Sequence, residues 1–225
     1  MLSLKLLNST TLVSGSNDLT MKVWSTVNGS MLQSVVLSPA TAFEILTDGS
    51  LVSGSIDGYL RKWNSDMSLS SYYFGTGYIV YSISLSYPVD SSNLWVVVGS
   101  GLGNVKTYRA RGGALVSTDT TEPYVGSYTY DMMLVSKSIL VTSALEPYIA
   151  VYDLKNHALL WRMVGHTYAA RGFELLADGT LASCGYIDYA VRVWNLNTGA
   201  ALRNYTGHTG DVYSVKQLFS GYFAS

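Results

Sequence analysis

Hydrophobic residues along this chain form short alternating runs that are separated by turn-forming residues. In residues 51–63, two such runs flank the turn 55–58, which is the pattern of a β-hairpin. Another apolar run precedes it at 43–46 and ends before an Asp-Gly turn, and residues 173–179 nearly copy this window. In the unit that contains residues 173–179, a fourth run follows at 200–204, after the turn 197–199. The pattern predicts units of four antiparallel strands, and no stretch has a helical period of useful length.

These units repeat along the chain. Five related segments each end in an aromatic residue, and they read LVSGSNDLTMKVW, LVSGSIDGYLRKW, WVVVGSGLGNVKTY, LVTSALEPYIAVY and LASCGYIDYAVRVW. The terminal aromatics are Trp24, Trp63, Tyr108, Tyr152 and Trp194, so the spacings are 39, 45, 44 and 42 residues. An interval of about 42 residues is the period of a propeller blade.

A four-stranded sheet with two apolar faces needs a neighbouring sheet on each side, and a ring of sheets provides both neighbours. We therefore expect an all-β chain, a β-propeller of four-stranded antiparallel blades. The period places five complete blades at about 1–34, 35–74, 75–118, 119–161 and 162–204, and a partial sixth at 205–225, in a single segment 1–225.

The fifth unit carries a family resemblance, because Gly165-His166 opens it, Ser183 lies on its second strand, Asp188 in the next turn and Trp194 at the end of its third strand. In this pattern the chain resembles WD-repeat β-propellers. The resemblance implies that His166, Ser183, Asp188 and Trp194 form one buried hydrogen-bond network that stabilises the blade.

The other units match the pattern less completely. The third unit has Leu102 in place of the turn acid, and no unit contains the Trp-Asp dipeptide. The fifth unit has one extra residue between Ser183 and Asp188, for which we expect a β-bulge. The turn acids and strand-end aromatics assigned to the structural pattern in other units are Asp18, Trp24, Asp57, Trp63 and Tyr152.

Five units and the start of a sixth form an incomplete ring. An open ring would expose apolar sheet faces. We expect the remaining blades to come from sequence outside these 225 residues, with a second copy of the chain as the less favoured source.

Composition narrows the classes of partner. Apolar residues make up 48% of the chain and charged residues only 13%, while Tyr occurs 18 times, which favours strands. A net charge of −1 disfavours nucleic acid, and the longest apolar run, 94–98, is too short to span a membrane. With one cysteine and no signal-peptide pattern, we expect a cytoplasmic protein, with the nucleus as the alternative.

Candidate chemistry is sparse. His166, Ser183 and Asp188 are the residue types of an acyl-transfer triad, but the family resemblance gives them a buried structural role. Cys184 lies in an apolar strand without a partner His and is interpreted as a core thiol. The three His and one Cys show no metal-ligand spacing, so we expect no metal, no cofactor and no catalytic residue.

Tyrosines supply the candidate binding surface. By analogy with the family, the loops that enter each first strand share one rim with the loops between second and third strands. The candidate rim residues are Tyr78, Tyr124, Tyr128, Tyr168 and Arg171. Tyr and Arg are enriched at binding hot spots, so we expect a protein or peptide partner here. The alternative for each tyrosine is that it only replaces Phe.

The sequence thus favours a non-catalytic scaffold for protein–protein interaction. One alternative is the recognition domain of a larger regulator, of the ubiquitin-ligase receptor or nucleotide-switch type. The alternative from a different class is a propeller hydrolase, which would need paired carboxylates or clustered histidines at one place, whereas the acids here recur one per unit.

Overall fold

Every regular element in the described part of the chain is a β-strand, as expected from the alternating pattern. The computed structural model describes residues 3–46, 48–74, 77–86, 94–101, 105–111, 114–121, 128–136, 138–156, 158–219 and 222–225. Within these ranges there is no helix of the length and hydrophobicity needed to cross a bilayer. The chain divides into two compact units, Met1–Gly101 with Val105–Thr121, and Leu102–Asn104 with Glu122–Ser225.

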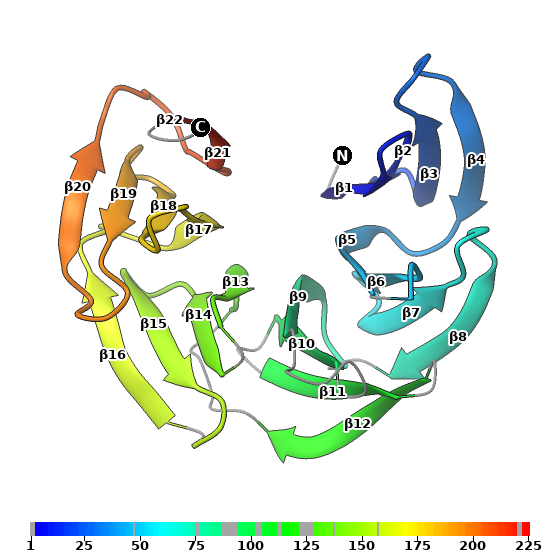
Figure 1. Ribbon diagram of the computed structural model, residues 1–225, viewed down its shortest axis with the longest axis horizontal. Coiled ribbons are helices and arrows are strands. Elements are labelled where there is room, and N and C mark those ends of the chain that lie inside the picture. Colours follow the sequence, from blue (N-terminus) through cyan, green and yellow to red (C-terminus); the bar gives the residue numbers. More distant parts are fainter. Residues whose placement is uncertain are drawn as a thin grey trace. The chain divides into compact units, whose positions relative to one another are not determined.

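The first unit contains three sheets, each made of four antiparallel strands in sequence order (Figure 1). Sheet 1 consists of β1 (Ser3–Asn8), β2 (Thr11–Gly15), β3 (Thr20–Ser25) and β4 (Met31–Val36). Sheet 2 consists of β5 (Ala40–Ile45), β6 (Leu51–Ser55), β7 (Tyr59–Trp63) and β8 (Leu69–Phe74). Sheet 3 consists of β9 (Val80–Ser86), β10 (Leu94–Ser100), β11 (Val105–Arg111) and β12 (Ala114–Thr121).

The second unit contains two further four-stranded sheets and a hairpin (Figure 1). Sheet 4 consists of β13 (Asp131–Leu134), β14 (Ile139–Ser143), β15 (Tyr148–Asp153) and β16 (Ala158–Val164). Sheet 5 consists of β17 (Ala170–Leu175), β18 (Leu181–Gly185), β19 (Val191–Trp194) and β20 (Ala201–Tyr205). The hairpin pairs β21 (Lys216–Phe219) with β22 (Tyr222–Ala224). Five four-stranded antiparallel sheets confirm the predicted propeller-blade fold class.

The two near-copies found in the sequence form the same turn. Leu46 N donates to Ser50 O and Gly49 N to Leu46 O, and the residues 176–180 repeat both bonds. In each turn an aspartate carboxylate accepts the backbone N–H two residues later, and Gly49 adopts a φ of 80° that a side chain disfavours. The local sequence therefore fixes the connection between the first and second strands of these sheets.

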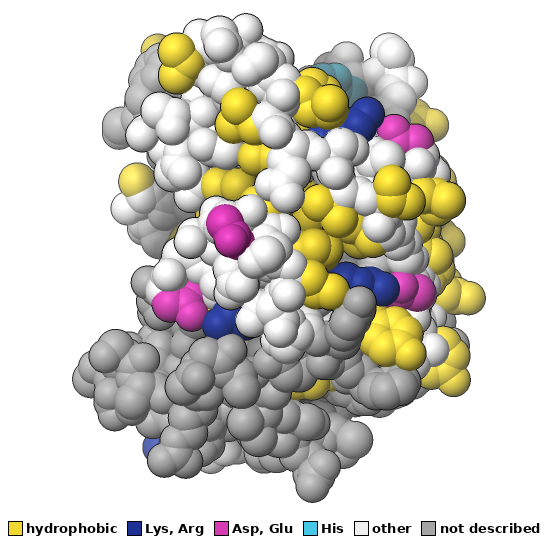
Figure 2. Space-filling view, turned by 90° about the vertical axis from the view of Figure 1, so that its right-hand side faces the viewer, with side chains coloured by type: hydrophobic (Ala, Val, Ile, Leu, Met, Phe, Trp, Pro, Cys, Tyr) yellow, Lys and Arg dark blue, Asp and Glu magenta, His cyan; other side chains and the backbone are white. Residues whose placement is uncertain are grey.

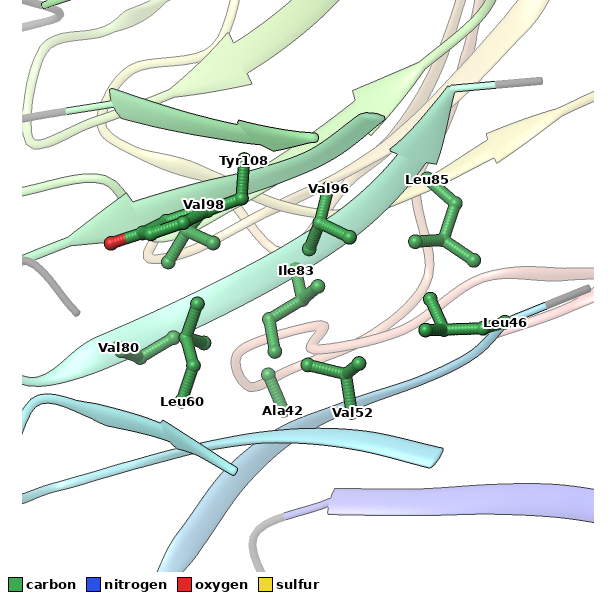
Figure 3. Packing of buried hydrophobic residues seen from close by; sticks show 10 residues of the cluster. All are labelled: Ala42, Leu46, Val52, Leu60, Val80, Ile83, Leu85, Val96, Val98 and Tyr108. Atoms are coloured by element: carbon green, nitrogen blue, oxygen red, sulfur yellow. The ribbon is translucent and has the colours of Figure 1, made fainter. Parts of the chain in front are cut away.

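Neighbouring sheets within the first unit pack face to face, and their first strands lie side by side. Sheets 2 and 3 enclose ten buried hydrophobic residues, with Val52 and Leu60 of sheet 2 facing Val80 and Val96 of sheet 3 (Figure 3). Sheets 1 and 2 enclose a second cluster, in which Trp63 packs against strands β2 and β3. Each face that is covered in this way removes apolar surface from water, at about 25 cal/mol per Å².

In the second unit, Trp194 of sheet 5 is fully buried in a cluster with Val141, Ile149 and Met163 of sheet 4. The opposite face of sheet 5 packs Cys184 against Val212, which precedes the final hairpin. Both faces of sheet 5 are therefore covered within its own unit.

The surface carries few charges, in keeping with the composition. Hydrophobic side chains are scattered over the face of the molecule in Figure 2, with only a few charged side chains between them. Strand β4 exposes Met31, Leu32 and Val36. Isolated apolar side chains of this kind are usual on protein surfaces.

Gly54 marks the closest approach between sheets 2 and 3, because a Cβ built there would lie 2.3 Å from Val80 Cγ1. We predict that Gly54→Ala destabilises the first unit by about 1–3 kcal/mol through overpacking. Urea unfolding followed by tryptophan fluorescence measures the loss. Gly101→Ala is the matched control, since its nearest neighbour would be 3.5 Å away. Equal losses for the two variants would contradict the close packing.

Candidate functional site

The four residues that the sequence singled out in the fifth unit form one continuous chain of hydrogen bonds. Trp194 Nε1 donates to Ser183 Oγ at 2.8 Å, and Ser183 Oγ lies 2.7 Å from His166 Nε2. His166 Nδ1 lies 2.7 Å from Asp188 Oδ2. If the Ser183 hydroxyl donates to His166 Nε2, the imidazole can donate its Nδ1–H to the carboxylate, and every member of the chain is satisfied.

Electrostatics favour this neutral form of the histidine. Burial lowers the pKa of His166 below its usual value of 6.5 and outweighs the opposing effect of the hydrogen bond to Asp188. The carboxylate of Asp188 also accepts a bond from Arg192 Nη2 at 3.3 Å, which supplies the compensating charge. The network thus joins the first-strand loop, two strands and a turn of sheet 5.

Other sheets contain parts of the same network. Trp24 donates to Ser14 at 2.8 Å in sheet 1, and Trp63 donates to Ser53 at 2.9 Å in sheet 2. Sheet 4 has Tyr152 at the aromatic position. At its serine position, the buried hydroxyl of Thr142 has no hydrogen-bond partner. The indole–hydroxyl bond therefore occurs in sheets 1, 2 and 5. Within the described part of the chain, only in sheet 5 does a histidine also bond the hydroxyl.

In sheet 2, which lacks the histidine, a cation four residues after the turn acid pairs with that acid. Arg61 Nη2 lies 2.6 Å from Asp57 Oδ2, and the hydroxyl of Ser55 donates to the same carboxylate at 2.7 Å. Burial alone would raise the pKa of Asp57, but the hydrogen bonds from Arg61, Ser55 and Tyr59 N lower it to about 2. The same spacing gives Asp18 with Lys22 at 3.8 Å and Asp188 with Arg192. This repeated acid–cation spacing is a signal of the pairs that is visible in the sequence.

The extra residue of the fifth unit lies in a turn. Strands β18 and β19 pair without a shift of register, so the predicted bulge is wrong. Ile187 and Tyr189 adopt positive φ angles of 75° and 54°, and Ile187 N donates to Asp211 at 2.9 Å. The turn therefore absorbs the insertion by left-handed backbone conformations, which the side chain of Asp211 helps to hold.

The second unit brings four tyrosines together around one arginine. The guanidinium of Arg171 lies over three tyrosine rings. Its Cζ atom is 4.2 Å from the ring centroid of Tyr130, 5.1 Å from that of Tyr186 and 5.5 Å from that of Tyr213. The ring of Tyr186 also packs against two other tyrosine rings, with centroid distances of 5.8 Å to Tyr168 and 6.3 Å to Tyr213. We call these five residues the tyrosine–arginine cluster.

Sequence comparison identifies the type of repeat. No family model matches the chain. It is 32% identical over 65 residues to NACHT domain- and WD repeat-containing protein 1 of Homo sapiens, over 29% of this chain and 4% of that protein. It is 25% identical over 179 residues to WD repeat-containing protein pop2 of Schizosaccharomyces pombe, over 75% of this chain and 22% of the relative. It is 34% identical over 77 residues to WD repeat-containing protein pop1 of the same yeast, over 34% of this chain and 10% of that protein.

The four-stranded units of this chain are similar to WD repeats. The fold and these relatives confirm the resemblance inferred from the sequence. The chain spans less than a quarter of the length of each of the three relatives.

The predicted rim residues have different surroundings in the structure. Tyr168 and Arg171 belong to the tyrosine–arginine cluster. Tyr128 is 42% exposed and has no ring contact with the cluster among the described residues. Tyr78 is exposed in the first unit, and Tyr124 lies outside the described residues.

Two members of the cluster, Tyr130 and Tyr213, were not predicted. Tyr213 occupies the position in the sixth repeat that Arg171 occupies in the fifth, because each lies five residues after the histidine of its Gly-His pair. Aligning the starts of the two repeats, GHTYAARGF and GHTGDVYSV, would have placed Arg171 and Tyr213 at equivalent positions of neighbouring repeats.

Reactive groups are few in the described part of the chain. Burial raises the pKa of the Cys184 thiol to about 12, so the sulfur is neutral and unreactive. No group of three or more His, Cys, Asp or Glu side chains is arranged to hold a metal ion among the described residues.

Ser183→Ala tests the complete network. Removing the hydroxyl leaves the indole of Trp194 and Nε2 of His166 without a partner in a buried site, so we predict a loss of about 1–3 kcal/mol. Hydrogen exchange of the peptides 181–194 and 11–24 measures the local stability around each substituted serine. Ser14→Ala is the control, because Ser14 bonds a single partly buried indole and its loss should be smaller. A larger effect of Ser14→Ala would contradict the network's role.

The depressed pKa of Asp57 predicts a dependence of stability on pH. A folded-state pKa of about 2 lies below the unfolded value, so the stabilisation is complete above pH 4 and is lost as the pH falls toward 2. We expect Asp57→Asn to remove about 1 kcal/mol of this acid-dependent stability, after solvent screening. Urea unfolding at pH 5, 4 and 3 gives the slope. Asp66→Asn, at an exposed turn, should change the slope less, and an unchanged slope in Asp57→Asn would refute the assignment.

Proposed function

We propose that this chain is a module for protein–protein interaction and that the tyrosine–arginine cluster of the second unit is its binding surface. The observation that carries the proposal is the stacking of Arg171 on three tyrosine rings, which come from the segment before β13, the turn after β18 and the segment before β21. WD-repeat relatives support an interaction role in general.

Partial exposure supports the proposal. Tyr213 is 59% exposed, and Tyr168 and Tyr186 are half-buried, so their rings can contact a partner. The rings already pack against one another, and Tyr213 donates a hydrogen bond to Asp211 at 3.3 Å. Because these side chains are ordered before binding, a partner would lose little conformational freedom from them.

The geometry of the Ser–His–Asp chain argues against a hydrolase. Ser183 is fully buried and His166 is 4% exposed, so a substrate cannot reach the hydroxyl without unfolding the sheet. The hydroxyl also accepts the indole N–H of Trp194. We therefore propose a structural role for these residues.

A second candidate function is recognition within a larger regulatory protein, of the ubiquitin-ligase receptor or nucleotide-switch type. It is favoured by the small share of each relative that the chain covers, and one relative carries a NACHT domain in its name beside the WD repeats. In that case the tyrosine–arginine cluster would select the target. A cytoplasmic or nuclear location stays a prediction.

Quantitative affinity capture tests the binding surface. The full chain, Tyr168→Ala, Arg171→Ala and Tyr213→Ala are used as baits for a cell extract, and retained proteins are compared by mass spectrometry. We expect the three variants to lose the same subset of proteins by at least tenfold, because they remove parts of one surface.

Tyr205→Ala is the matched control, since Tyr205 is 42% exposed on the last strand of sheet 5 and outside the cluster. It should retain that subset. Circular dichroism establishes that each variant is folded. Identical retention by all baits would refute the proposed surface.

A further inference from the structure

The Arg171 guanidinium has no anionic partner within the described part of the chain. Its described contacts are the three tyrosine ring faces, and its Nε is buried without a hydrogen bond. Stacking uses the faces of the planar guanidinium and leaves the N–H groups at its edge available. A partly buried cation without a counter-charge is unfavourable, so this edge is suited to an incoming anion.

The backbone conformation next to Arg171 fixes the position of this side chain. Strand β17 shifts register between Arg171 and Phe173, and the intervening Gly172 adopts a φ of 57°. A Cβ at Gly172 would lie 2.8 Å from Tyr213 O and from Ser214 Cα. The bulge therefore brings the strand that carries Arg171 against the segment that carries Tyr213.

Residues near the start of the first strand bond to the next sheet in other repeats. Thr41 in sheet 2 donates to the backbone carbonyl of Val80 in sheet 3. Asp131 in sheet 4 accepts the backbone N–H of Phe173 in sheet 5 at 3.2 Å. Arg171 likewise reaches the next segment, at Tyr213, but only through a ring face. Its hydrogen-bonding groups are thus not needed for joining the sheets.

The charges around the cluster favour a ligand group with a single negative charge over one with two. Asp211 accepts a hydrogen bond from the hydroxyl of Tyr213, and burial together with Asp211 raises the pKa of that hydroxyl. A phosphate group carries about −1.5 to −2 charges and would be repelled more strongly by Asp211 than a carboxylate would. A carboxylate matches the planar fork of one guanidinium with two parallel hydrogen bonds.

Resting on the proposed function, we propose that the edge of Arg171 receives an Asp or Glu carboxylate of an acidic peptide segment in the partner, while the surrounding tyrosines contact its apolar flanks. The partner is therefore identified by chemistry, as a chain that presents an acidic side chain next to apolar or aromatic residues.

A peptide array with matched sequences tests the inference on the full chain. Each nonapeptide is synthesised with Glu, Gln or phosphoserine at its centre and with Tyr, Leu or Ala at the flanking positions. We expect the wild-type chain to retain Glu peptides at least tenfold more than the Gln peptides. Arg171→Gln should abolish the difference, and Arg171→Lys should reduce it, because Lys lacks the planar fork. Arg203→Gln, at an exposed arginine of β20, should leave it unchanged.

A second measurement does not depend on the folding of a variant. In the wild-type chain labelled with ¹⁵N at arginine, N-acetylglutamate N-methylamide should shift the Nε–H resonance of Arg171, and the matched glutamine compound should not. Inorganic phosphate serves as the third probe.

Each outcome supports or overturns the assignment of a carboxylate to Arg171. Equal retention of Glu and Gln peptides, or a shift with neither or both amino-acid compounds, overturns the inference. Retention of phosphoserine peptides without Glu peptides overturns it in favour of a phosphate ligand. If captured proteins depend on Tyr168 and Tyr213 while no acidic preference is found, the proposed function stands and only the carboxylate assignment fails.

Discussion

Each sheet of this chain has two apolar faces, and its stability depends on a neighbouring sheet that covers them. The buried clusters between sheets 1 and 2, sheets 2 and 3, and sheets 4 and 5 meet this requirement. Because first strands of neighbouring sheets lie side by side, the loops before them are held close together. The packing that buries the apolar faces therefore also positions the candidate binding residues of each unit.

The hydrogen-bond network of sheet 5 and the tyrosine–arginine cluster share one turn. Asp188 lies in this turn and bonds His166, while Tyr186 at its start contacts Arg171. Asp211 bonds the backbone of Ile187 in the same turn and the hydroxyl of Tyr213. The buried network and the partly exposed cluster are thus mechanically connected, and a change that loosens the turn would disturb both.

The sequence predicted the period, the four-stranded units and the residues of the complete network, because each of these depends on local pattern and spacing. It did not predict Tyr130 and Tyr213, since their contact with Arg171 depends on packing between different repeats. The insertion before Asp188 was interpreted as a bulge, although left-handed conformations at Ile187 and Tyr189 absorb it in the turn. Backbone conformations of this kind are rare outside glycine and leave no clear compositional signal.

The first-strand position two residues before Phe43 and Phe173 carries the hydroxyl of Thr41 in one repeat and the guanidinium of Arg171 in another. Since the sheets are held by their apolar faces and the indole–hydroxyl bonds lie elsewhere, this position tolerates widely different chemistry. A repeat protein built in this way can acquire a new specificity by a single exchange at one junction, while the remaining junctions preserve the architecture.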